Sequence, residues 1–380
     1  MSKILEKRRL TIQVLRKLSA TKGTFTINDV KEELNLPRST VQDWISRFLE
    51  EGTVTVVSEA SGRKPATYKY SARPVNPCKK ILTTVDEDAG LVEIYHFCES
   101  MGAKYYCSDE YRKQGLVYEC DVAGNFLRQK ARIGSSPITL NPDSRFSIGI
   151  EEVSLDEGFV VQTVKSIPGG PAVAVTSTMG QAKGVLNVEI EEHGNLVVGR
   201  IRTRAYRRVL VGVDDTDAGD DPTSATWEVS MKLLNVLEDI QGVEPLNHKL
   251  VRLNPAVRFA TGGNVAAFIE LAVLLNKVQE AKEAVVDFLR ENVVSDNCAL
   301  AWLEGLVIPR QLEEYANAVR QRLVSLKEAK EVAHASRVER IPITGELGFV
   351  GALAAVAFVD APMEVLMDPS KELKVSTPSP

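Results

Sequence analysis

Apolar positions in the first fifty residues recur at helical spacing. Between residues 5 and 18 they follow a period of about 3.6, which predicts a first helix. Thr26 is a favourable N-cap for a second helix over residues 27–34, which a proline-containing break ends. Ser39 is the predicted cap of a third helix that runs to about residue 51 and stops before a glycine. The pattern therefore predicts three short helices at the front of the chain.

Two short runs rich in β-branched residues, 53–58 and 66–70, follow the third helix, with a turn-forming segment between them. They predict a hairpin with a basic tip. Helix, helix, proline-marked turn, helix and basic hairpin form the order of a winged helix-turn-helix, whose third helix enters the major groove of DNA. The predicted nucleic-acid contacts lie on that helix and on the hairpin tip: Arg38, Ser39, Thr40, Gln42, Arg47, Arg63 and Lys64. The alternative is a winged helix that serves protein contact or dimerisation.

The middle of the chain has a mixed pattern without a clear chemical motif. Five runs predict strands: 81–85, 116–120, 160–164, 172–176 and 196–201. The pattern of residues 90–101 predicts a helix. No grouping of catalytic or metal-binding side chains emerges, so a structural domain is the favoured interpretation of this region.

From residue 208 onward the pattern of apolar and polar positions predicts individual elements more clearly. A buried strand over 209–213 is followed by polar residues and a predicted helix over 224–241, and a second strand follows at 249–253. Three further helices are predicted, over 262–275, 278–292 and 312–334, and the Gly/Ala-rich run 346–358 is expected to pack closely on its neighbours. The fold class is thus α+β multidomain. The predicted parts are a winged helix at 1–73, a mixed α/β domain at 78–206, an α/β domain at 207–367 and a disordered tail at 368–380.

Composition and charge indicate the compartment of the protein and the part of the chain where a polyanion would bind. The chain has 380 residues, 44% of them hydrophobic, and a net charge of −5. Residues 1–72 nevertheless hold thirteen Lys and Arg against eight Asp and Glu, so a polyanion is expected to bind at the front. Five cysteines without a C-x-x-C pair argue against a zinc ribbon or a disulfide framework. We find no signal peptide or membrane-spanning run, and expect a soluble, cytoplasmic homodimer without a membrane partner.

Three acidic residues follow the buried strand at 209–213. Asp214, Asp215 and Asp217 stand at a strand-to-loop junction, where carboxylates can hold Mg²⁺ and the phosphates that it bridges. An acidic loop that is simply solvated is the alternative, because such clusters are common on surfaces.

Four motifs occur in one order in this part of the chain. They are Val-Gly-Val-Asp-Asp-Thr-Asp at 211–217, Leu-Val-Arg-Leu-Asn-Pro at 250–255, Thr-Gly-Gly-Asn at 261–264, and Gly-Phe-Val-Gly-Ala-Leu-Ala-Ala at 348–355. Over about residues 208–360 they resemble the catalytic portion of the archaeal tRNA-isoleucine agmatinylcytidine synthetases, ATP-dependent enzymes that modify tRNA. The aspartate signature also resembles that of methanogenesis marker proteins.

The resemblance implies roles for individual residues. Asp214, Asp215 and Asp217 would bind Mg²⁺ and ATP, and four residues of the following motifs would contact the nucleotide: Asn254, Thr261, Gly263 and Asn264. Thr226 is the nearest counterpart of the family's phosphate-accepting threonine, with Thr223 as the alternative. Arg252 is the basic residue that remains for catalysis, and Arg258 is a candidate substitute for lost ones.

The chain departs from the family at its basic positions. Ala260 and Gly262 stand where the family has Lys and Arg, and Glu346-Leu347-Gly348 replaces a Gly-Arg-Gly. The family's zinc-ribbon cysteines are absent, and a helix-turn-helix stands at the front instead, which argues against tRNA agmatinylation. The lost donors would weaken stabilisation of a transferring phosphoryl group.

Two functions remain. The first, which the lost basic residues favour, is a DNA-binding transcriptional regulator whose synthetase-like domain senses a nucleotide or another phosphate-bearing ligand. The alternative is an ATP- and Mg²⁺-dependent enzyme that modifies RNA or a small amine by phosphoryl activation. The expected partners are therefore double-stranded DNA, a nucleotide and, in the second case, RNA. A purely architectural role is disfavoured by the ordered motifs.

Overall fold

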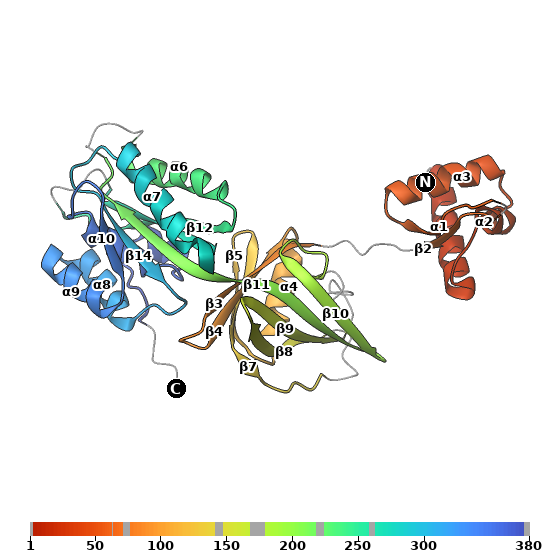
Figure 1. The fold of residues 1–380 in the computed structure, drawn as a ribbon, viewed down its shortest axis with the longest axis horizontal. Coiled ribbons are helices and arrows are strands. Elements are labelled where there is room, and N and C mark those ends of the chain that lie inside the picture. The colour runs from red at the N-terminus through yellow and green to blue at the C-terminus, as the bar shows by residue number, and fades with distance from the viewer. Residues whose placement is uncertain are drawn as a thin grey trace. The chain divides into compact units, whose positions relative to one another are not determined.

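The structure is a computed structural model that describes residues 3–62, 64–70, 77–140, 147–167, 179–217, 224–257 and 263–375. The chain divides into two compact units, Met1–Asn76 and Pro77–Pro380 (Figure 1). The first unit consists of three helices and one antiparallel hairpin: α1 (Lys3–Lys22), α2 (Ile27–Leu34), α3 (Arg38–Glu50), β1 (Val54–Ser58) and β2 (Thr67–Tyr70). These are the elements predicted from the sequence.

Local capping explains where α2 begins and ends. The backbone N–H of Asp29 donates to the Thr26 hydroxyl at 3.2 Å, and the Thr26 N–H donates to the Asp29 carboxylate at 2.8 Å. Asn35 ends the helix in the left-handed conformation, with φ of 51°. The cap predicted for α3 at Ser39 is wrong. The N-cap is Pro37, two residues earlier, because its carbonyl accepts the first helical hydrogen bond, from the Val41 N–H at 3.1 Å.

The second unit contains one large curled sheet with helices on its faces (Figure 1). Its elements in chain order are β3 (Cys78–Asp86), β4 (Leu91–Cys98), α4 (Met101–Tyr111), β5 (Val117–Ala123), β6 (Phe126–Arg132), β7 (Gly134–Ser135), β8 (Ser147–Asp156), β9 (Phe159–Ile167), β10 (Val185–His193), β11 (Leu196–Asp214), α6 (Thr226–Glu238), β12 (Val243–Arg252), β13 (Val265–Leu274), a 3₁₀ turn (Leu275–Lys277), α7 (Val278–Asn292), β14 (Ala299–Glu304), α8 (Arg310–Gln321), α9 (Leu326–Ala335), β15 (Glu339–Pro342), α10 (Phe349–Val356) and α11 (Met363–Met367). No described helix is long and apolar enough to cross a membrane.

The 19-residue strand β11 joins the two halves of this unit. Its first half pairs with β9 and β10, and its second half pairs with β13 and β14, all antiparallel. Between them, Ala205 and Tyr206 pair with β3 in parallel. The domain boundary predicted at 206/207 thus falls inside one continuous strand.

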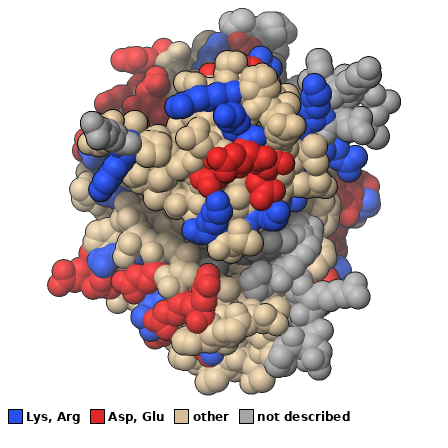
Figure 2. Space-filling model, turned by 90° about the vertical axis from the view of Figure 1, so that its right-hand side faces the viewer, with Lys and Arg blue, Asp and Glu red and all other residues tan. Residues whose placement is uncertain are grey.

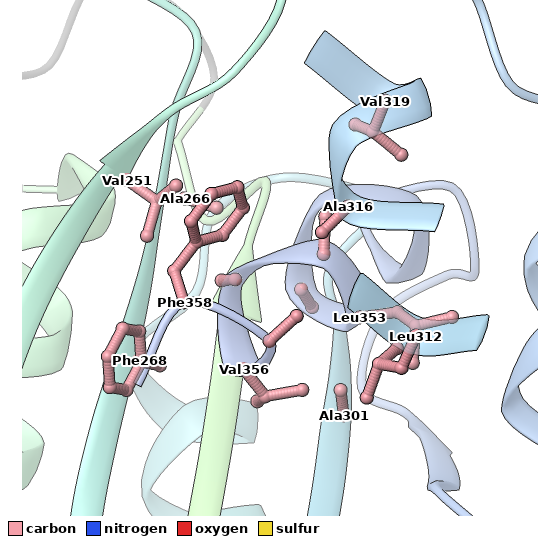
Figure 3. Close-up of a cluster of buried hydrophobic side chains, with 14 of the residues drawn as sticks. Val251, Ala266, Phe268, Ala301, Leu312, Ala316, Val319, Leu353, Val356 and Phe358 are labelled. Atoms are coloured by element: carbon pink, nitrogen blue, oxygen red, sulfur yellow. The ribbon is translucent and has the colours of Figure 1, made fainter. Parts of the chain in front are cut away.

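Alternation along β11 places its side chains on two helical layers. Val209, Val211 and Val213 pack against α6 and α7. Leu210 faces the opposite layer of α8, α9 and α10, part of which Figure 3 shows around Leu353 and Val356. The predicted close packing of the Gly/Ala-rich run is confirmed. A Cβ on Gly212 would lie only 2.1 Å from the Ala352 carbonyl oxygen, so α10 rests directly on the strand.

Several secondary-structure predictions are wrong for physical reasons. Residues 262–275 contain strand β13 instead of a helix, because this strand is buried on both faces and therefore lacks the alternation that marks strands. The helix predicted over 90–101 is strand β4, which Gly90 starts from a turn with φ of 65°, and α4 begins only at Met101. The predicted strand at 172–176 lies outside the described residues.

The C-terminal end of the chain also differs from prediction. The helix predicted over 312–334 is broken into α8 and α9 at Ser325, whose hydroxyl caps α9. Leu373, in the tail predicted to be disordered, is held in place: the Leu373 N–H donates to the Asn317 side chain at 2.8 Å, and Asn317 donates back to the Leu373 carbonyl at 2.9 Å.

A buried ionic network joins the strands at the centre of the second unit. The Arg208 guanidinium is fully buried and lies 3.3 Å from the Glu93 carboxylate, while its Nε donates to the Gly305 carbonyl at 2.9 Å. The nearby buried carboxylate of Glu270 accepts a hydrogen bond from Asn247 at 2.7 Å. Arg128 continues the network to Asp360, with 2.7 Å between the charged atoms. Each buried charge thus depends on its partners.

His96 gives the second unit a pH-dependent stability. Burial lowers its pKa to about 4, whereas an unfolded histidine titrates near 6.5. The unfolded state therefore binds the proton more readily, so we expect the free energy of unfolding to fall as the pH drops from 6.5 to about 4, by about 3 kcal/mol. Urea titrations across this range measure the slope. His96→Gln should flatten it and exposed His193→Gln should not; equal slopes in wild type and His96→Gln would contradict this origin.

Candidate functional site

A cavity of about 860 Å³ opens in the second unit at the end of β11. It brings together five of the residues predicted for the site, namely Asp214, Asp215, Asp217, Thr226 and Asn264. They come from the end of β11, the start of α6 and the start of β13. Residues from the sequence motifs of this region and from the start of α6 therefore meet in space.

Asp214 and Asp215 end the strand in an unusual backbone geometry. Asp215 has φ of 59°, a left-handed conformation uncommon for residues other than glycine and often found at functional sites. Its carboxylate accepts a hydrogen bond from Ser295 at 2.7 Å, and its N–H donates to Asp214 Oδ1 at 2.9 Å. Burial raises the pKa of Asp214 to about 8; the Asp215 N–H opposes this shift, and the nearby charges of Asp215 and Asp217 add to it. The two carboxylates are thus oriented in a partly dehydrated site.

Glycines at three-residue intervals make room for these aspartates. A Cβ on Gly351 would lie 1.8 Å from Asp214 Oδ2, and a Cβ on Gly348 would lie 2.6 Å from the Asp214 carbonyl oxygen. Gly345 approaches the Asp296 carbonyl equally closely, at 2.2 Å. The start of α10 therefore sits directly against the carboxylates.

Thr226 is held at the first turn of α6. Its hydroxyl accepts a hydrogen bond from Thr216 at 3.2 Å, and the same Thr216 hydroxyl lies 2.8 Å from the Ser224 carbonyl oxygen. Thr226 is only 8% exposed, yet it lines the cavity. The predicted alternative, Thr223, lies outside the described residues.

The remaining predicted site residues take different positions. Arg252 is exposed on β12 and is not among the residues that line the cavity. Asn254 is buried, and its carbonyl accepts a hydrogen bond from the Asn264 side chain at 2.7 Å, so it braces a lining residue. Gly263 precedes that residue with φ of 104°. Thr261 and Arg258 lie outside the described residues.

These aspartates can hold a magnesium ion only together with oxygen atoms from water and from a bound ligand. No three His, Cys, Asp or Glu side chains in the described part of the chain converge as a complete metal cage. Mg²⁺, however, is usually held by one or two carboxylates together with waters and substrate phosphates. The hard oxygen donors of Asp214 and Asp215, which line the cavity, suit such a shared site.

Several lining residues carried no signal in the sequence. Ser295, Asp296 and Asn297 reach the cavity from the turn before β14, and Arg322 to Leu326 reach it from the turn between α8 and α9. Ser295 stands 80 residues beyond Asp215 along the chain, and the others stand farther still. Only the Gly345, Gly348 and Gly351 spacing could have been noticed as a sign of close packing.

In the first unit, the residues predicted to bind nucleic acid are largely exposed. Arg38, Ser39, Gln42, Arg47 and Lys64 are exposed, Thr40 is half-buried, and Arg63 lies outside the described residues. Arg47 pairs with Asp43 on the same helix at 3.1 Å. On the molecular face in Figure 2, Lys and Arg side chains surround a group of acidic ones, so positive charge there is interspersed with negative charge.

Comparison with known proteins identifies the region around the cavity. The family model described as the TiaS TCKD domain matches residues 210–287. The C-terminal region is TiaS-like. TiaS, the 2-agmatinylcytidine synthetase of an isoleucine tRNA, is 30% identical in Pyrococcus horikoshii and 29% identical in Thermococcus sibiricus, over 153 and 157 residues, which is 39% of this chain in each case. The matched part spans only 35% of either synthetase. The resemblance predicted from the four motifs is confirmed for this region.

Three further similarities, to one other protein and two solved structures, cover different shares of this chain. An uncharacterized protein of Methanocaldococcus jannaschii is 29% identical over 288 residues, which covers 74% of this chain and 94% of that protein. The solved complex of TiaS with its isoleucine tRNA and ATP is 26% identical, with a TM-score of 0.35, over 40% of this chain and 36% of that one. The complex of TiaS with the same tRNA, AMPCPP and agmatine has a TM-score of 0.34 at 23% identity, again over 40% and 36%.

Proposed function

We propose that this chain is an ATP- and Mg²⁺-dependent enzyme that activates an RNA substrate by phosphoryl transfer. This is the alternative of the two functions drawn from the sequence, and the comparisons support it better than a DNA-binding regulator. The observation that carries it is the pair Asp214 and Asp215, which lie in the region that matches the TiaS TCKD domain and pack against Gly348 and Gly351. The two archaeal synthetases with the same region are named for a modified tRNA, which supports RNA as a partner.

The proposed roles follow from the contacts. Asp215, oriented by Ser295, and Asp214 would hold Mg²⁺, which when bound would neutralise charge on the phosphates. Asn264 would contact the nucleotide from another wall of the cavity, with Asn254 and Gly263 fixing its position. Thr226 would accept a phosphoryl group. Arg252 is exposed outside the cavity, so a catalytic role for it has less support than the others.

The first unit would act as a winged helix that delivers nucleic acid. Its three helices, its hairpin and the exposed polar face of α3 support this assignment. An RNA substrate fits the TiaS-like region. Double-stranded DNA, with the second unit as a nucleotide sensor, is the second candidate, because Arg38 and Gln42 are exposed at the start of α3, where a base-reading helix needs them. The predicted homodimer remains a prediction.

Incubation with γ-labelled ATP, Mg²⁺ and a tRNA pool tests the enzyme. We expect label to appear on the protein or the RNA, and phosphate or diphosphate release to depend on both Mg²⁺ and RNA. Asp215→Asn should abolish the reaction, because it removes a charge from the ion's donor set. Asp156→Asn, on the distant strand β8, is the matched control and should react as wild type does. Turnover that survives Asp215→Asn would contradict the assignment.

Arg38→Ala and Arg47→Ala should weaken nucleic-acid binding by the first unit. Both side chains are exposed on α3, and a contact of this kind is typically worth about 1–3 kcal/mol. Fluorescence anisotropy with a selected duplex and with tRNA measures the loss and tells the two partners apart. Lys31→Ala, exposed on α2, is the control. If both arginine variants bind the duplex and the tRNA as tightly as the wild type does, docking of nucleic acid through α3 is excluded.

A further inference from the structure

The cavity is strongly acidic for a site that would bind a polyanion. Four aspartates line it: Asp214, Asp215, Asp217 and Asp296. A nucleoside triphosphate with one Mg²⁺ still carries a net negative charge, so the ionised carboxylates among these aspartates would repel it unless a cation joined them.

Among the described residues that line the cavity, one carries a positive charge. This is Arg322, which follows α8 directly. Its side chain is 53% exposed, and it is held by Glu328 of α9 through hydrogen bonds that include one of 3.0 Å from Nη1 to Oε2.

The Arg322–Glu328 pair is easily exchanged. Exposed ion pairs of this type contribute little to stability, so a stronger acceptor can displace the carboxylate at small cost. The planar guanidinium binds both oxygens of Glu328, and the same geometry suits two oxygens of a phosphate group. The four residues 322–325 form a short connection between α8 and α9, and all four line the cavity.

We propose that Arg322 leaves Glu328 and binds the phosphate chain of the nucleotide, as the cationic side chain among the described residues that line the cavity. The proposal rests on the proposed function, since it names a further binding residue of the same site. Arg322 then determines specificity for nucleotides that carry phosphate groups over adenosine, which carries none.

Titration calorimetry with Mg²⁺ and ATP, ADP or adenosine tests this assignment. Arg322→Met should lower ATP affinity at least tenfold and leave adenosine affinity within twofold of wild type, and Arg322→Lys should recover part of the loss. Glu328→Gln releases Arg322 from its partner and should leave ATP affinity unchanged or raised. Arg310→Met removes an exposed arginine at the other end of α8, paired with Glu314, and is the matched control.

Each outcome has one meaning. Equal losses in Arg322→Met and Glu328→Gln would show that the ion pair only braces the turn, and would overturn the proposal. Wild-type ATP affinity in Arg322→Met would overturn it as well, while leaving the proposed function intact. Failure of the wild-type protein to bind Mg²⁺ and ATP would instead contradict the proposed function, and this inference with it.

Discussion

Gly351→Ala is expected to disable the nucleotide site. The added methyl group would lie 1.8 Å from Asp214 Oδ2 and 2.9 Å from a methyl carbon of Leu253, so either the carboxylate or α10 must move. Forcing a methyl group into such a packed position typically costs about 1–3 kcal/mol, and here the strain falls on a proposed metal ligand. We expect affinity for Mg²⁺ and ATP to drop by roughly 5- to 150-fold. Calorimetry and urea unfolding of the same samples separate lost binding from lost folding.

Gly102→Ala is the matched control for this variant. A Cβ on Gly102 would meet nothing within 4 Å, and the residue lies in the first turn of helix α4. The change should leave nucleotide binding intact and raise stability by about 0.4–1 kcal/mol, because alanine loses less backbone entropy than glycine on folding. Wild-type binding in Gly351→Ala would show that the position of Asp214 does not govern the site.

Arg208→Met is expected to cause a large loss of stability. The substitution leaves the buried carboxylates of Glu93 and Glu270 without their nearest cation and the Gly305 carbonyl without its 2.9 Å donor. Breaking a buried ion pair from one side typically costs about 3–5 kcal/mol. Urea unfolding of the full chain, followed by a signal from the second unit, measures the effect.

The neighbouring Arg207→Met provides the comparison for Arg208→Met. Arg207 lies on the same strand but is 30% exposed, and its nitrogen is 4.0 Å from Glu304. Such a pair contributes about 0–1 kcal/mol, so its loss should be small. Similar, small losses in the two variants would mean that the buried network adds nothing beyond ordinary surface pairs.

The first unit could be predicted from sequence because its signals are local. The apolar period of α1, the Thr26 cap and the Asn35 stop all act within one or two turns. Prediction from local sequence patterns failed at β13, because burial on both faces removes the alternation of apolar and polar residues that distinguishes a strand from a helix. It also placed a boundary inside β11, since an apolar strand does not reveal how far it continues.

The candidate site, too, was predicted only in part from the sequence. Asp214, Asp215 and Asn264 were recognised because they stand in ordered motifs, and the cavity unites them. Ser295 and Arg322 were missed because only the tertiary fold brings their turns to the aspartates. Arg252 was chosen for its charge and motif, but strand alternation turns it away from its buried neighbours Val251 and Leu253.

Calorimetric titration of ATP into the wild-type protein and into Asp215→Asn, each with and without Mg²⁺, measures the proposed nucleotide site most directly. We expect saturable binding by the wild type that requires Mg²⁺, and a loss of about tenfold or more in the variant, because the ion would lose one of its few protein ligands. Equal affinities of the two proteins, or wild-type binding that is indifferent to Mg²⁺, would contradict a metal-assisted nucleotide site at the end of β11.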